Sequence, residues 1–272
     1  LIEIGEFAFA YCEGLTGQLV LPKGLTKIGR RAFEGCSGLT EVHFPEGLTE
    51  IDEGAFNNCI RLTAVAFPKG LTGIGQYAFY GCSGLTGPLV LPQGLTEIGA
   101  YVFYKCSGLT GPLDLPPRLT RIGVRAFMFG HNLTGPLVLP PGLTEVGEDA
   151  FFGCWRLTEV HFPQGLTGIG QSAFYGCICL SEVHFPESLT TIGKAAFYKC
   201  IGLTGPLVLP PGLIEIGEDA FEQCTNVKAI FCSEELEEKV CAAGGADIMT
   251  AAIGKVKKAR RVVEVGFQTL GG

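Results

Sequence analysis

The sequence predicts a solenoid over residues 1–231: about ten coils of 23–24 residues, with short parallel strands and short helical turns. Two observations predict this class. One unit of sequence recurs along most of the chain, and a single unit is too short to build a hydrophobic core of its own. The register is set by a phenylalanine that follows Ala or Val in each unit, at intervals of 23 or 24 residues. These residues are Phe9, Phe33, Phe56, Phe79, Phe103, Phe127, Phe151, Phe174, Phe197 and Phe221.

The first element of each unit is a short strand that occurs in two forms. The short form reads Glu-Val-His-Phe-Pro or Ala-Val-Ala-Phe-Pro, and the long form reads Gly-Pro-Leu-Val-Leu-Pro or a near variant. Both forms end at a proline, which cannot donate to a strand ladder and so ends the strand. We therefore expect the extra residue of the long form to be absorbed where the segment begins. The short forms occupy 41–45, 64–68, 159–163 and 182–186; the long forms occupy 17–22, 87–92, 111–116, 135–140 and 205–210.

A second extended segment and a turn complete each unit. Leu48–Ile51 is an example of the second segment, which is usually followed by glycine, as at Gly29 and Gly75. The Ala-Phe-x-x-Cys segment that follows is too short for more than one turn of helix. Glycine makes up 40 of the 272 residues, about twice the usual share of about 7%. Tight corners in every coil, which glycine turns without steric cost, are the expected reason.

The composition excludes several classes of protein. Hydrophobic residues are 47% and charged residues 17%, the opposite of the bias that keeps a chain disordered. Glycine, proline or a charge interrupts every apolar stretch before the roughly 18 residues of a membrane-spanning helix, so we expect no membrane span. The net charge of −7 gives no general attraction to nucleic acid or to anionic lipid.

The recurring pattern Leu-Thr-x-Ile-Gly-x-x-Ala-Phe-x-x-Cys-x-x-Leu-Thr-x-Val-x-Phe-Pro, as at 71–91 and 143–163, resembles the BspA-type leucine-rich repeat. The resemblance covers residues 1 to about 231 and implies a leucine-rich-repeat solenoid. Members of this family are known mainly from cell-surface and secreted proteins that bind host proteins or other cells. The resemblance therefore implies a non-enzymatic binding module of the kind found in adhesins, located at the cell surface or secreted.

Nine of the twelve cysteines share one repeat position, and Gly130 takes that position in the remaining unit. A thiol at the same inward position of every coil is interpreted as a ladder of small buried hydrophobes. Disulfides between neighbouring coils are the alternative, because stacked strands lie about 4.8 Å apart. Metal ligation is less favoured, since cysteine ligands come in local pairs and only Cys177 and Cys179 are close. The nine are Cys12, Cys36, Cys59, Cys82, Cys106, Cys154, Cys177, Cys200 and Cys224.

No catalytic set is apparent, and we expect neither enzymatic activity nor a cofactor. Three histidines occupy one outward strand position, each with a glutamate two residues earlier on the same face. In consecutive coils, Glu159, His161, Glu182 and His184 should form a two-by-two patch. This patch is either a metal site, since imidazole and carboxylate are suitable ligands, or a solvated polar strand face. Asp114, Glu148 and Asp149 are interpreted as surface residues.

The strand face is the expected partner-binding surface. Solenoids present one outward position per coil as an extended ladder, and exposed valines interspersed with His and Asp form a moderately apolar stripe. Valine also favours strands for purely structural reasons, which is the alternative explanation. The candidate residues are Val20, His43, Ala66, Val90, Asp114, Val138, Glu159, His161, Glu182, His184 and Val208. The expected ligand is a protein or an extended polymer bound by a monomeric solenoid.

The second candidate function is a structural spacer or surface-layer element without a specific ligand. Columns of threonine could suggest ice binding, but they do not alternate as Thr-x-Thr, so no flat two-column array is built.

Residues 232–272 are expected to differ in kind from the repeats. Residues 233–243 are predicted to form a capping helix, with Ser233 as N-cap and Gly244 ending it. The run 255–261 holds five basic residues and is interpreted as a solvated tail, with a nucleic-acid or targeting role as the alternative. Since Leu1 falls in mid-repeat, we expect a fragment of a longer protein, whose missing segment would carry any targeting signal.

Overall fold

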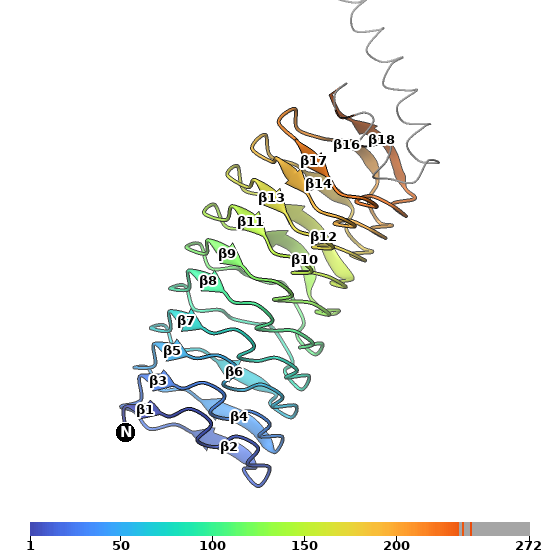
Figure 1. Cartoon of the computed structure of the whole chain (residues 1–272). Coiled ribbons are helices and arrows are strands. Elements are labelled where there is room, and N and C mark those ends of the chain that lie inside the picture. The colour runs from blue at the N-terminus through green and yellow to red at the C-terminus, as the bar shows by residue number, and fades with distance from the viewer. Residues whose placement is uncertain (234–235, 237–239, 241–272) are drawn as a thin grey trace, which may run out of the picture.

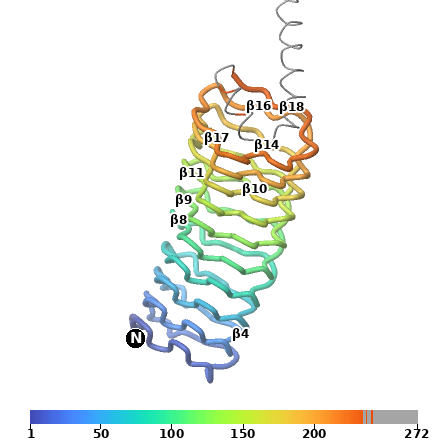
Figure 2. The backbone as a smooth tube through the Cα atoms, turned by 45° about the vertical axis from the view of Figure 1, so that its right-hand side comes forward, coloured from blue at the N-terminus to red at the C-terminus, as the bar shows by residue number. Residues whose placement is uncertain are grey.

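The computed structural model describes residues 1–233, Leu236 and Val240. The chain winds once per repeat and stacks its coils into an elongated solenoid, which confirms the predicted class (Figure 1; Figure 2). Of the expected cap helix 233–243, Ser233, Leu236 and Val240 are described; Leu236 and Val240 are helical and buried, and the amide of Leu236 donates 3.1 Å to the carbonyl of Ser233. The rest of that helix and the basic run 255–261 lie outside the described residues.

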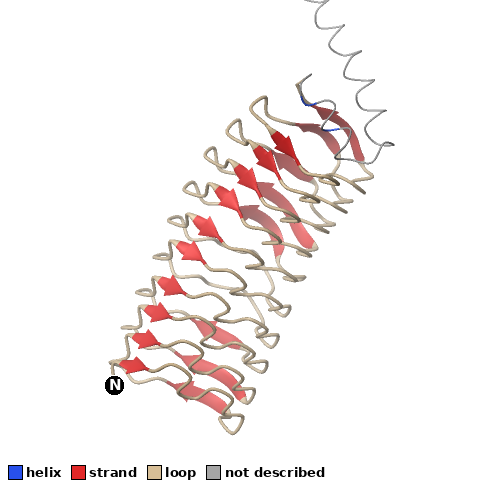
Figure 3. Cartoon of the chain, viewed as in Figure 1, coloured by secondary structure: helices blue, strands red, loops and turns tan. Residues whose placement is uncertain are grey.

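Two columns of parallel strands, joined by loops, line the solenoid, and the second column is interrupted in the coils between β6 and β10 (Figure 3). The first column consists of two-residue strands: β1 (Glu3–Ile4), β3 (Lys27–Ile28), β5 (Glu50–Ile51), β7 (Gly73–Ile74), β8 (Glu97–Ile98), β9 (Arg121–Ile122), β11 (Glu145–Val146), β13 (Gly168–Ile169), β15 (Thr191–Ile192) and β17 (Glu215–Ile216). The second column has longer strands: β2 (Gly17–Val20), β4 (Leu39–His43), β6 (Ala64–Ala66), β10 (Thr134–Val138), β12 (Arg156–His161), β14 (Glu182–His184), β16 (Gly205–Val208) and β18 (Val227–Phe231).

Within each sheet, strands pair with the equivalent strand of the next coil. Ile51 of β5 lies opposite Ile74 of β7, and Val160 of β12 lies opposite Val183 of β14. These side chains point into the core, and their neighbours along the strand point to solvent, as strand geometry requires. The second column is divided into three sheets, β2-β4-β6, β10-β12-β14 and β16-β18, with isolated bridges in the coils between β6 and β10.

The core is organised around the phenylalanine of each repeat. The ten rings form nine stacked pairs between neighbouring coils, with centroids 5.2–5.8 Å apart and planes within 6–15° of parallel. Leucine and isoleucine from the two strand columns pack around this stack, and the preceding Ala or Val is buried in the coils from 32 to 220. The apolar period of the sequence is therefore the period of the core.

The Ala-Phe segment forms a chain of tight turns and differs in detail from the expected short helical turn. In one coil, the amides of Ala32 and Glu34 donate to carbonyls three residues back, whereas the amide of Phe33 donates 2.8 Å to the carbonyl of Ala55 in the next coil. The backbone is left-handed at Arg31 (φ 50°), and the same turn position has positive φ in every complete coil. A residue in this region cannot continue a right-handed helix. Bonding between coils overrides the local helical preference.

The glycine after each two-residue strand has a different cause from the one expected. Gly170 has no positive φ, but a Cβ there would lie 2.7 Å from the backbone nitrogen of Glu148 in the preceding coil. Gly217 is tighter still, at 2.2 Å from the nitrogen of Lys194. Glycine at this corner permits close stacking of coils. The expectation that glycine is needed here for its conformational freedom is wrong for this position.

The long and short strand segments are reconciled at their first residues, as expected. The pairing of β10 with β12 shifts register between Gly135 and Pro136, where Gly135 has φ 79°. The equivalent shift in β16 lies between Gly205 and Pro206. In a parallel strand, alternate amides face the same neighbour. The amide of Thr204 donates 3.1 Å to the carbonyl of Ser181 in the preceding coil, and Pro206 lacks the next amide that would do so.

Candidate functional site

All nine positions of the outward column on the strand face are exposed. Val20 in β2 and Val90 at an isolated bridge to Asp114 keep 73% and 72% of their surface accessible. The residues on either side of Val90, Leu89 and Leu91, are buried. The column therefore faces solvent along its whole length. Its members are Val20, His43, Ala66, Val90, Asp114, Val138, His161, His184 and Val208.

Four polar residues of this face come together as a two-by-two patch on β12 and β14. His161 lies opposite His184, and Glu159 lies opposite Glu182. Each histidine contacts the glutamate of its own strand, with Nε2–Oε2 distances of 3.2 Å for His161 and 3.7 Å for His184. Across the described residues, no group of three or more His, Cys, Asp or Glu is arranged to hold a metal ion. The patch has the geometry of a solvated polar strand face.

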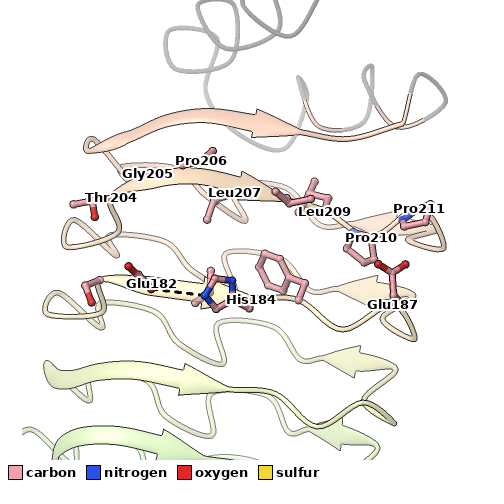
Figure 4. A pocket seen from close by; sticks show the side chains of 14 residues that line it. Glu182, His184, Glu187, Thr204, Gly205, Pro206, Leu207, Leu209, Pro210 and Pro211 are labelled. Atoms are coloured by element: carbon pink, nitrogen blue, oxygen red, sulfur yellow. Dashed lines mark ion pairs between the residues drawn. The ribbon is translucent and has the colours of Figure 1, made fainter. Parts of the chain in front are cut away.

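A groove opens where β14 and β16 fail to pair, and we name it the Pro206 groove (Figure 4). It has a volume of about 410 Å³. Pro206 has no amide hydrogen to donate to β14, so the hydrogen-bond ladder between β14 and β16 does not form. The register shift at the start of β16 also separates the two strands. Phe185 and Leu207 supply apolar walls, while the carboxylates of Glu182 and Glu187 lie toward its two ends.

A second groove has the same origin three coils earlier, and we name it the Pro136 groove. It lies between the arm 113–117 and β10, has a volume of about 240 Å³, and is walled by Leu113, Leu139 and Pro136. Asp114 and Val138 of the outward column also line it. Each groove is thus an apolar notch in the strand face, placed where a long-form proline interrupts pairing with the preceding coil.

The repeat-position cysteines form a ladder of free thiols. From Cys36 onward they are buried, and each Sγ donates to the carbonyl of the core phenylalanine of the preceding coil, for example 3.2 Å from Cys106 to Phe79 and 3.1 Å from Cys224 to Phe197. Burial raises the pKa of Cys154 to about 12. Because the thiolate is the reactive form, these thiols are chemically inert. The burial of these cysteines agrees with the interpretation made from the sequence. Their hydrogen bonds to the phenylalanine carbonyls could not be predicted from residue type alone.

A family model for the BspA type leucine-rich repeat region matches residues 2–134 and 144–240 in six copies. The chain belongs to this family. The match covers most of the chain, including the coils that carry the two grooves and the outward column.

Solved structures of other leucine-rich and leucine-rich-repeat proteins are similar to this chain. A leucine rich cell surface protein of Faecalibacterium prausnitzii A2-165 is 25% identical, with a TM-score of 0.54 over 90% of this chain and 79% of that one. The leucine rich repeat protein of T. pallidum is 29% identical, with a TM-score of 0.47 over 67% and 72%. A leucine-rich repeat protein of Bacteroides ovatus ATCC 8483 is 24% identical, with a TM-score of 0.40 over 88% and 84%. No match is found among curated proteins.

The BspA-type solenoid also carries an aromatic edge that sequence reasoning missed. Rings of successive coils stack along the outside of the turn segment, such as Tyr80 on Tyr104 at 4.7 Å and Phe152 on Tyr175 at 4.4 Å. These rings are half-buried. The aromatic edge could have been predicted from the sequence, because an aromatic residue directly follows the core phenylalanine in several units.

One residue assigned to the surface is buried. Asp149 is only 6% exposed, and its carboxylate accepts a 2.8 Å bond from Nε of Arg125 in the preceding coil. The surface interpretation of Asp149 is therefore wrong, and its role is to hold a charge pair between coils. Asp114 and Glu148 are not buried. In the described part of the chain, no helix has the length and apolar character that a membrane crossing requires.

Proposed function

We propose that this solenoid is a non-enzymatic interaction module that binds a protein or an extended polymer along its strand face. The observation that carries the proposal is the outward column: nine successive exposed positions, four of them valine, on strands held in register by the core. Isolated exposed valines are ordinary, but an aligned apolar stripe is typical of partner sites.

The family of this chain and its solved relatives support a role as an interaction module. The family is one of repeat proteins, and the F. prausnitzii relative is a cell surface protein. We extend this to the present chain as a proposed surface location and an adhesin-like role, acting as a monomer. The inert thiols and the two-by-two patch offer no nucleophile with an activating base, which supports a role in binding over catalysis.

Site-specific photo-crosslinking tests the proposal. A photoreactive amino acid placed at Val90, Val138 or His161 should capture one ligand from cells or extracellular material that carry the natural partner. The same group at Thr96, which is exposed and directly precedes β8 of the column of two-residue strands, serves as the control. The captured ligand is then purified, and its affinity is measured against Val90→Lys and Val138→Lys variants. Crosslinking only from Thr96, or unchanged affinity in the variants, would place the site elsewhere and favour a spacer role for the strand face.

A further inference from the structure

The two grooves lie on one face at a defined separation. The Pro136 groove precedes β10 and the Pro206 groove follows β14, so β10, β12 and β14 separate them. Val138, His161 and His184 are consecutive partners across these three strands. Parallel strands are about 4.8 Å apart, so three coil steps place the groove centres about 14 Å apart along the solenoid axis.

This separation selects the conformation of a ligand that fills both grooves. An extended polypeptide advances about 3.4 Å per residue, and residues i and i+4 project from the same side about 13.5 Å apart. In an α-helix, residues on one face recur at i+7 or i+11, about 10.5 or 16.5 Å apart, and neither value matches. The spacing therefore favours an extended strand lying along the axis, with anchor residues four positions apart.

The charges around the grooves favour a positively charged ligand. Asp114 lines the Pro136 groove, and Glu182 and Glu187 line the Pro206 groove; neither groove is lined by Lys or Arg. Glu159 lies between them, exposed on β12. An anionic surface of this kind favours cationic partners and opposes acidic ones. Apolar notches flanked by carboxylates thus suit apolar side chains that alternate with basic ones.

We propose that the strand face from 113 to 211 binds an extended basic peptide segment running along the solenoid axis. Two apolar side chains, four residues apart, enter the Pro136 groove and the Pro206 groove, and basic side chains between and beside them face Glu159, Glu182 and Glu187. This inference rests on the proposed function, because it uses the same strand face, and it specifies the partner's conformation and chemistry.

The probe is a labelled eleven-residue peptide with two leucines four positions apart, lysines midway between them and at both flanks, and threonine elsewhere. Its affinity for the full chain is measured by fluorescence polarisation. A control peptide has the same composition with the leucines three positions apart, which places them on opposite sides of an extended strand. We expect the control peptide to bind at least tenfold more weakly, and the affinity of the first peptide to fall with added salt.

Protein variants assign the contact to the grooves. Val138→Lys and Val208→Lys each add a cation at the rim of one groove and should each lower the affinity at least tenfold. Thr96→Lys adds the same charge directly before β8, beside the other strand column, and should leave the affinity unchanged. Circular dichroism checks folding; if a valine variant unfolds, Glu182→Gln and Glu187→Gln, both at exposed sites, should weaken binding and flatten its salt dependence.

Equal binding of the two peptides, or an equal effect of Thr96→Lys, would overturn the proposal. Failure of both peptides together with specific crosslinking from Val138 or His161 would overturn the basic-peptide inference and leave the strand-face function standing. Failure of both experiments would overturn both, so the two outcomes are distinguishable.

Discussion

The imidazole of His131 stacks on the indole of Trp155, with ring centroids 3.8 Å apart and planes 7° from parallel. His131 follows Gly130, the glycine that replaces the ladder cysteine in its coil, and Nε2 of His131 is buried without a hydrogen-bond partner. Burial lowers the pKa of His131 from its ordinary value of 6.5. The central coil thus places a titratable ring against the single tryptophan of the chain.

This contact predicts a loss of stability at mildly acidic pH. Because the folded state resists protonation of His131, the unfolded chain takes up the proton first as the pH falls below about 6.5. The free energy of unfolding should therefore decrease as the pH falls below about 6.5 and keep its full value at higher pH. Urea unfolding monitored by Trp155 emission at pH 5 and pH 8 measures the difference. His131→Phe keeps a ring on Trp155 without a titration; a variant with the same pH dependence as the wild type would contradict the assignment.

The stacking of coils predicts that replacing glycine by alanine destabilises the protein at one glycine and much less at another at the same repeat position. Gly170→Ala brings Cβ to 2.7 Å from a backbone nitrogen and 2.8 Å from a backbone carbon of the preceding coil, which must move apart. We expect a loss of about 1–3 kcal/mol in the free energy of unfolding. Gly5→Ala is the matched control, because Gly5 is at the same corner with no atom within 4 Å of the added Cβ. Equal effects in urea denaturation would show that backbone entropy, and not packing, explains this glycine.

The sequence was sufficient for the fold because its period is the period of the core: the spacing of Phe9 to Phe221 set every coil. It was also sufficient to place Val90 and His161 on the outward face, since strand alternation follows from side-chain pattern. It did not reveal the grooves, because the effect of Pro206 depends on which neighbour the missing amide would face. The burial of Asp149 was missed for a similar reason, as its partner Arg125 belongs to another coil.

The continuous ring stack predicts that coupling between core phenylalanines is limited to neighbouring coils. Phe103 and Phe127 have centroids 5.5 Å apart, so Phe103→Leu and Phe127→Leu each disturb the surroundings of the other. The double variant should deviate from additivity by about 0.5–3 kcal/mol, measured by urea unfolding. Phe56→Leu with Phe174→Leu is the control pair, separated by several coils, and should be additive within about 0.5 kcal/mol. Additivity in both pairs would mean that the rings contribute independently.

The buried cysteines of the thiol ladder and the exposed Cys179, which lies outside the ladder, should react at different rates. In the folded protein, burial raises the pKa of Cys154 to about 12 and that of Cys82 well above its ordinary value, so neither supplies thiolate at neutral pH. Reaction with a thiol reagent should therefore be slow at the buried positions and faster at Cys179, which is exposed. Cys179→Ser should remove amplitude from the fast phase and leave the slow phase intact. After denaturation without reductant, close to twelve thiols should react, the full cysteine count of the chain. Three or fewer would instead mean that neighbouring coils are joined by disulfides.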